Sequence, residues 1–151
     1  MIDYIIQTLM GAIGSVGFAV LFNVRGKRLV LFFLGGALDW AVYLLCYHNG
    51  CTSFISMFFA TMTAALTSEV LARIIHTPVL LLLVPMLVPL IPGGDLYRSM
   101  DALIRSEQAK FLSYGSSAIT AAGAICLGII CVTAITHVIF SIGDQIRKHS
   151  R

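Results

Sequence analysis

The sequence predicts an all-α, polytopic membrane helix bundle with about five transmembrane spans. The chain of 151 residues is 58% hydrophobic and 11% charged, with a mean hydropathy of +0.93, whereas an ordinary soluble domain is about 25% charged. Five hydrophobic blocks also fill nearly the whole length. They leave no room for a separate soluble domain, so we expect residues 1–151 to form a single transmembrane domain.

The first three spans are predicted over residues 5–22, 29–47 and 52–71, because each block approaches the roughly 20 apolar residues that cross a bilayer. In the first block, Gly11, Gly14, Ser15 and Gly17 put small residues at spacings of three and four, which lets another helix approach closely. The N-terminus lacks a basic region and a small-residue cleavage site. The first block is therefore expected to stay in the protein.

Three ionisable residues are predicted inside the spans and are candidate sites of proton or cation coupling. Asp39 is the eleventh of nineteen residues in the second span, near the membrane midplane, where an ionisable group is expensive. Glu69 lies near the end of the third span, and His137 lies in the last. Each also has a structural alternative. Asp39 is protonated or hydrogen-bonded to a neighbouring helix, Glu69 snorkels to the membrane surface or pairs with Arg73, and His137 makes a hydrogen bond.

The most unusual stretch runs from Val84 to Asp95 and contains Pro85, Pro89 and Pro92. Proline removes a helical hydrogen bond, so these residues are expected to free the carbonyls of Leu81, Pro85 and Val88. The apolar block 78–92 spans only about 22 Å as a helix against a core of about 30 Å. Either residues 74–92 form a kinked span, which we prefer, or the block is re-entrant.

Two further helices complete the chain. Residues 95–112 have apolar side chains at helical spacing opposite Arg98, Asp101 and Arg105, which predicts an amphipathic helix at the membrane interface. Residues 114–142 are apolar and rich in small residues, and they predict the last span.

Positive charges predict the orientation, because loops rich in Lys and Arg stay in the cytoplasm. With five spans and the N-terminus outside, seven basic residues fall inside and three outside. The inner ones are Arg25, Lys27, Arg28, Arg73, Arg147, Lys148 and Arg151, and the outer ones are Arg98, Arg105 and Lys110. The expected location is a bacterial cytoplasmic (inner) membrane, with the C-terminus in the cytoplasm.

The junction at Gly93, Gly94 and Asp95 is a candidate substrate site. A helix N-terminus attracts a carboxylate, glycine allows close approach of a ligand, and proline-freed carbonyls accept an ammonium group. The alternative is a sharp turn between two helices. The candidate substrate-binding residues are Pro85, Pro89, Pro92, Gly93, Gly94, Asp95, Tyr97 and Arg98.

Other function classes have little support. The net charge of +3 comes from short basic clusters beside apolar blocks, so we expect a lipid bilayer and no nucleic acid as partner. Four cysteines show no zinc-site spacing, and no HExxH or GxSxG motif is present. We therefore expect no metal, no cofactor and no enzymatic activity.

Three segments together resemble the C-terminal half of the threonine/serine exporter family. They are residues 15–24 (SVGFAVLFNV), 34–40 (LGGALDW) and 84–100 (VPMLVPLIPGGDLYRSM). The resemblance covers most of the chain. It implies a secondary exporter of small hydroxy amino acids, in which a short protein of this kind works with a larger membrane subunit that carries the other half. One such pair is associated with succinate export.

The chain departs from the family pattern at two positions. Arg25 stands where the family usually has proline, and Asp39 stands where it usually has a small residue before the tryptophan. Asp39 is therefore not assigned a general family mechanism: it either tunes the substrate of this protein or makes a local polar contact.

The sequence thus predicts a subunit of a proton-driven exporter of a small carboxylate-bearing solute, of the threonine/serine type. Hetero-oligomers, homo-oligomers or both are expected. Two alternatives stay open: a subunit of a dicarboxylate exporter, and a membrane scaffold that does not transport. A scaffold would tolerate changes to its polar residues but would lose its partner when Gly11 or Gly123 became leucine.

Overall fold

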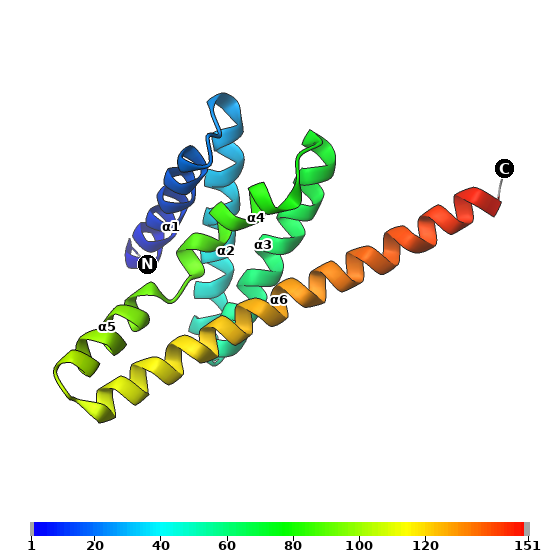
Figure 1. The fold of residues 1–151 in the computed structure, drawn as a ribbon. Coiled ribbons are helices and arrows are strands. Elements are labelled where there is room, and N and C mark those ends of the chain that lie inside the picture. The colour runs from blue at the N-terminus through cyan, green and yellow to red at the C-terminus, as the bar shows by residue number, and fades with distance from the viewer. Residues whose placement is uncertain (1, 150–151) are drawn as a thin grey trace.

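The computed structural model describes residues 2–149, and it describes side chains for residues 2–139. The described chain contains helices and no strands, which confirms the predicted all-helical fold (Figure 1). The elements are α1 (Ile2–Leu21), η1 (Gly26–Arg28), α2 (Leu29–His48), α3 (Ser53–Ile75), α4 (Val79–Leu87), η2 (Val88–Leu90), α5 (Gly93–Ile104) and α6 (Gln108–His149).

Four stretches are each long and apolar enough to cross a membrane: α1, η1 with α2, α3, and α6 up to Ile139. A fifth span forms if residues 79–90 and 93–104 are taken together, and these two parts are bent by 55° at their break. The structure is therefore a polytopic helical bundle with four or five spans.

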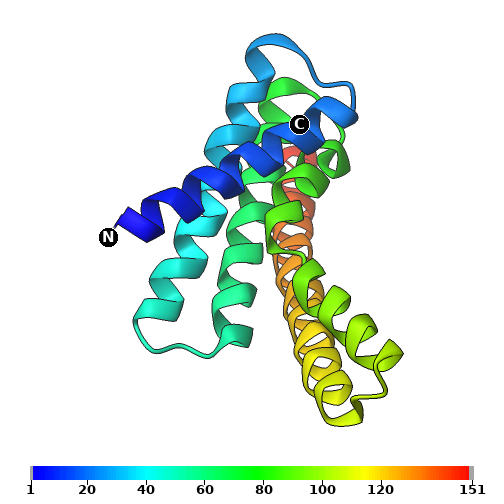
Figure 2. The same cartoon turned by 90° about the vertical axis from the view of Figure 1, so that its left-hand side faces the viewer.

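Helices α1 to α4 form a bundle, and α5 and α6 form a hairpin beside it (Figures 1 and 2). In this bundle α2 packs between α1 and α3, and α6 crosses α3 on its way from α5 to the C-terminus. The turns at residues 49–52 and 105–107 lie toward one end. The connections at residues 22–28 and 76–78 lie toward the other (Figure 1).

The core consists largely of small residues, which allow the helices to approach closely. Ala60, Ala64 and Ala65 of α3 form one buried cluster with Leu83, Leu87, Leu90 and Val132. At the crossing with α6, a Cβ added to Gly128 would lie 2.9 Å from the Thr61 Cβ and 3.0 Å from the Phe58 carbonyl oxygen. The crossing point of α3 and α6 therefore requires a glycine.

The kinked span begins later than the predicted residues 74–92. Ile74 and Ile75 belong to the last turn of α3, and His76 ends that helix with a left-handed φ of 53°. The Thr77 N–H bonds to the Ala72 carbonyl at 3.0 Å and closes the turn. Because Thr77 precedes Pro78, it disfavours the α conformation, and the chain restarts as α4 at Val79.

The amphipathic helix predicted over residues 95–112 was too long at its C-terminal end, since α5 ends at Ile104. Ser106 has a φ of 58°, and the Glu107 N–H bonds to the Ala102 carbonyl at 2.9 Å. Residues 108–112 belong instead to the start of α6. Helix α5 buries the small residues Ser99 and Ala102, and its larger apolar side chains are exposed.

The last helix exceeds the predicted span 114–142 at both ends, running from Gln108 to His149. The side chains of Arg147 and Lys148, and all of Arg151, lie outside the residues that the structure describes at that level. Their predicted orienting role stays a prediction.

Candidate functional site

Asp39 is the most deeply buried ionisable side chain among the candidate coupling sites, with 1% of its surface exposed. Neither of its carboxyl oxygens has a hydrogen-bond partner among the described residues. A buried polar group normally costs free energy unless it is paired, and such unpaired groups concentrate at functional sites. The described residues therefore do not include the hydrogen bond from a neighbouring helix that was one structural alternative for Asp39.

Two adjacent glycines of α2, Gly35 and Gly36, allow close contact with α4 and α1 respectively. A Cβ added to Gly36 would lie 2.7 Å from the Ser15 Cβ of α1, and one added to Gly35 would lie 2.7 Å from the Met86 sulfur of α4. The Ser15 Oγ is fully buried and, like the Asp39 carboxyl, has no hydrogen-bond partner among the described residues. Two unpaired polar groups thus lie along one tightly packed seam.

Helical spacing puts Asp39 at the level of the broken helix. Asp39 follows Gly35 and Gly36 by four and three residues, so the three share one face of α2. Because α2 and α4 run in the same direction (Figure 1), a residue one turn beyond Gly35 lies beside the residues that follow Met86. Those residues form η2, which contacts both α1 and α2.

The proline segment is divided between the bundle and the hairpin. Pro85 lies inside α4 and is buried, Pro89 lies in η2, and Pro92 immediately precedes α5. The expectation that the Val88 carbonyl is free is wrong, because it accepts the Ile91 N–H at 3.2 Å. Pro92 has no N–H to donate to the Val88 carbonyl, and a tight 3₁₀ turn supplies the Ile91 N–H as the donor instead.

Beyond the break, Gly93 and Gly94 are exposed, and no heavy atom lies within 4 Å of a Cβ added to either. The Ser117 hydroxyl of α6 donates a hydrogen bond to the Asp95 Oδ2 at 2.7 Å. The glycines therefore leave open space at the start of α5, whereas Asp95 ties α5 to α6.

Tyr97 and Arg98 lie on α5 and do not join Asp39 in the bundle. Tyr97 is 75% exposed, and the Arg98 guanidinium carbon lies 5.8 Å from the centre of the Tyr114 ring. Nearby, a hydrogen bond from Arg105 to Asp101 raises the pKa of the guanidinium above its usual value. The predicted substrate-binding residues are thus spread along the broken span.

Glu69 and His137 have surroundings that differ from those of Asp39. Glu69 pairs with Arg73 at 3.1 Å on the same helix, as its structural alternative foresaw, and His137 is exposed on α6. Among the described side chains, no group of three His, Cys, Asp or Glu residues is placed to hold a metal ion.

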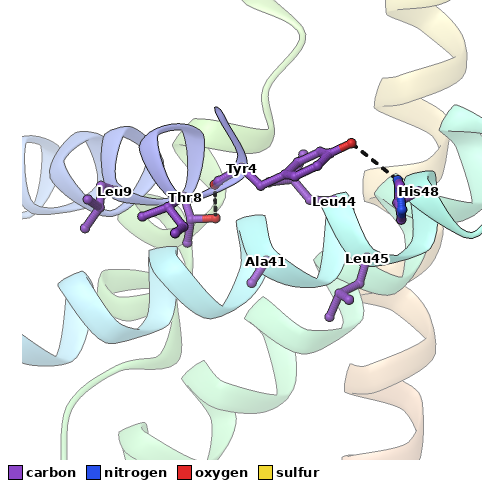
Figure 3. Close-up of a pocket in the computed structure, with 8 residues that line it drawn as sticks. Tyr4, Thr8, Leu9, Ala41, Leu44, Leu45 and His48 are labelled. Atoms are coloured by element: carbon purple, nitrogen blue, oxygen red, sulfur yellow. Dashed lines mark hydrogen bonds between the residues drawn. The ribbon is translucent and has the colours of Figure 1, made fainter. Parts of the chain in front are cut away.

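Sequence reasoning missed a groove of about 470 Å³ between α1 and α2. Its walls are mostly apolar, and Figure 3 shows Tyr4 reaching across it to His48, with 3.3 Å between the Tyr4 Oη and the His48 Nδ1. The packing of α1 against α2 forms this groove, so no local sequence motif could predict it.

The chain was compared with family models, curated proteins and solved structures. The family model described as "Threonine/Serine exporter, ThrE" matches residues 7–135, which is most of the chain and includes Asp39 and the proline segment. No curated protein matched. No solved structure matched. The chain therefore belongs to the threonine/serine exporter family, and it is an exporter-type membrane protein.

Proposed function

We propose that this chain is one subunit of a secondary-active exporter of serine, threonine or a similar small solute, and that it works with a larger membrane subunit. Asp39 carries the proposal. Asp39 is a carboxyl group in the middle of a span, 1% exposed and without a hydrogen-bond partner among the described residues. Such a group is costly to bury, and binding of a proton or a cation offsets that cost. The membership of the family supports export as that use.

In the proposed mechanism, Asp39 binds the coupling proton or cation at the seam of α1, α2 and η2. Glu69 and His137 are secondary candidates for the same task. The solute occupies the break between Pro85 and Asp95, where Gly93 and Gly94 leave room for it. Tyr97 and Arg98 contact its carboxylate or gate its exit.

Two features favour a partner subunit. His137 lies in a spanning helix and is exposed, and a polar side chain facing lipid is unfavourable. The apolar side chains of α5, including Leu96, Met100 and Leu103, are also exposed. A larger subunit covering α5 and α6 would bury both surfaces and complete the path.

The proposed location is the bacterial inner membrane, with the N-terminus outside and the C-terminus in the cytoplasm. Arg25, Lys27, Arg28 and Arg73 then lie at the cytoplasmic end, which agrees with the preference of basic residues for that side. Arg98, Arg105 and Lys110 lie at the outer end, where Asp101 and Glu107 pair with the last two.

The test is uptake of labelled serine, threonine and succinate into energised everted membrane vesicles. The vesicles contain this chain, its candidate partner subunit, or both. We expect one solute to accumulate only when both proteins are present, and a protonophore to abolish that accumulation. Accumulation of succinate alone would select the dicarboxylate alternative. If both proteins are inserted and nothing accumulates, export of these three solutes is ruled out, which leaves a different substrate or the scaffold alternative.

A further inference from the structure

A second pocket, of about 280 Å³, lies at the end of the bundle where the connection from α1 to α2 meets the connection from α3 to α4. Its rim is polar and includes Asn23, Arg25, Arg28 and Thr77. Its floor is apolar and includes the buried residues Phe32 and Leu82. This combination suits a ligand that has an anionic group and a short carbon chain.

The same backbone conformation, a left-handed residue just after a helix, shapes both walls of the pocket. Asn23, two residues beyond the end of α1, has a φ of 62°, and the Val24 N–H bonds to the Ala19 carbonyl at 3.0 Å. At the other wall His76 ends α3 in the same left-handed conformation, and the Thr77 N–H closes the turn. These bonds are those of a Schellman cap, which fixes the path of the chain as it leaves a helix.

Apolar packing supports the two walls from below. Val24 from one connection and Ile75 from the end of α3 pack against the buried cluster that contains Phe32 and Leu82. The pocket therefore has its shape before any ligand arrives, and a preformed site loses less entropy on binding.

The charges at the rim are unbalanced. Arg25 and Arg28 have no carboxylate partner among the described side chains, and Glu69, an acidic residue near this end of α3, pairs with Arg73. A guanidinium presents several N–H groups in a plane and matches the two oxygens of a carboxylate or phosphate. Orientation in the membrane explains positive charge in this loop, but it requires no pocket lined by two arginines.

We propose that this pocket binds a carboxylate or phosphate group between Arg25 and Arg28, with the attached carbon chain over Phe32 and Leu82. The proposal rests on the proposed function in one respect: in the proposed orientation the pocket is cytoplasmic, and the exported solute supplies the carboxylate. The headgroup of an anionic phospholipid is the other source of the same chemistry.

The position of the pocket fits the first binding step of an exporter. Phe32 precedes Asp39 by seven residues on α2, which is about 10 Å along the helix axis. Phe32 and Leu82 belong to the same buried cluster as Met86, which packs against Gly35 on the Asp39 face of α2. The floor of the pocket is therefore continuous with the seam that contains Asp39.

The test uses the full chain carrying Thr77→Cys in lipid nanodiscs, which expose both faces. The rate of maleimide labelling at residue 77 is followed by peptide mass spectrometry, so that the four native cysteines are counted separately. Labelling is compared with and without succinate or serine, in phosphatidylcholine and in mixtures with phosphatidylglycerol.

We expect a solute with a carboxylate to slow labelling in pure phosphatidylcholine. Arg25→Gln with Arg28→Gln is expected to weaken this protection about tenfold, because two charge-assisted contacts are lost. The matched control is Lys27→Gln, since Lys27 lies between the two arginines and does not line the pocket. Lys27→Gln removes one positive charge from the same loop, against two in the double variant, and is expected to leave protection unchanged.

Slow labelling in phosphatidylglycerol without added solute, lost with the arginines, would assign the site to lipid headgroups. The proposal is overturned if neither solute nor lipid changes labelling, or if Lys27→Gln acts as strongly as the double variant. Transport without protection would overturn this site and leave the exporter proposal standing. Protection without transport would support this site and contradict the exporter proposal.

Discussion

Gly36 of α2 lies directly against Ser15 of α1, so that a Cβ added to Gly36 would fall 2.7 Å from the Ser15 Cβ and 3.3 Å from the Gly11 carbonyl oxygen. Neither the backbone nor a Cβ can swing away as the end of a long side chain can. The glycine therefore sets how closely the two helices approach, and this contact lies one turn from Asp39.

We expect Gly36→Ala to destabilise the chain by roughly 1 to 3 kcal/mol, as overpacking of a core usually does. The melting temperature should fall by about 2 to 4 °C for each kcal/mol. Thermal unfolding in detergent, followed by the fluorescence of the single tryptophan, Trp40, measures the change.

Gly17→Ala is the matched control, because a Cβ at that position meets nothing within 4 Å. Adding Ser15→Gly to Gly36→Ala removes the clashing Cβ and should restore most of the lost stability. Equal melting temperatures for Gly36→Ala and Gly17→Ala would contradict the close contact.

The crossing of α3 and α6 predicts a second pair of variants. Gly128→Ala should destabilise the chain, because a Cβ there already meets Thr61 and the Phe58 carbonyl. Gly123→Ala should leave the melting temperature of this chain unchanged, because a Cβ at Gly123 meets nothing within 4 Å. The effect of Gly123→Ala on co-purification with a partner subunit then reports on the contact with the partner alone. A large loss of stability in Gly123→Ala would contradict the described packing.

The contact between Asp95 and Ser117 predicts a coupling between α5 and α6. A hydrogen bond to a charged group contributes about 1.5 to 3 kcal/mol when well shielded, and this partly exposed one should contribute less. In a double-mutant cycle, Ser117→Ala should cost stability in the wild-type background and almost nothing after Asp95→Ala. Additive effects of the two changes would show that the bond does not hold the hairpin together.

The same variants separate two roles of Asp95. If Asp95 acts on export by positioning α5, Ser117→Ala should lower transport in parallel with Asp95→Ala. If Asp95 contacts the solute directly, only Asp95→Ala should raise the KM strongly.

Much of the fold could be predicted because span length and hydropathy are local properties of the sequence. The break near Pro92 was equally visible, since proline and glycine act on their own backbone. The end of α5 was not visible, because residues 105–108 contain neither glycine nor proline, and Ser106 adopts its left-handed φ through bonds made by its neighbours.

The site was harder to predict than the fold. Asp39 stood out as a carboxylate in an apolar block, but the contact of Gly36 with Ser15, one turn away from Asp39, depends on how α1 pairs with α2. The pocket at Arg25 and Arg28 likewise joins two connections about 50 residues apart, which no spacing rule brings together. The expectation of a free Val88 carbonyl was wrong because the Ile91 N–H in a 3₁₀ turn bonds to it.

The most direct test of the central claim compares Asp39→Asn with the wild type in everted vesicles that contain the partner subunit. Asparagine keeps the shape of the side chain and removes the ionisable group, so the melting temperature should stay close to that of the wild type. We expect the variant to lose accumulation driven by a proton gradient and to keep exchange of labelled for unlabelled solute without a gradient. Gradient-driven accumulation at the wild-type rate by a folded Asp39→Asn variant would contradict the role of Asp39 in coupling.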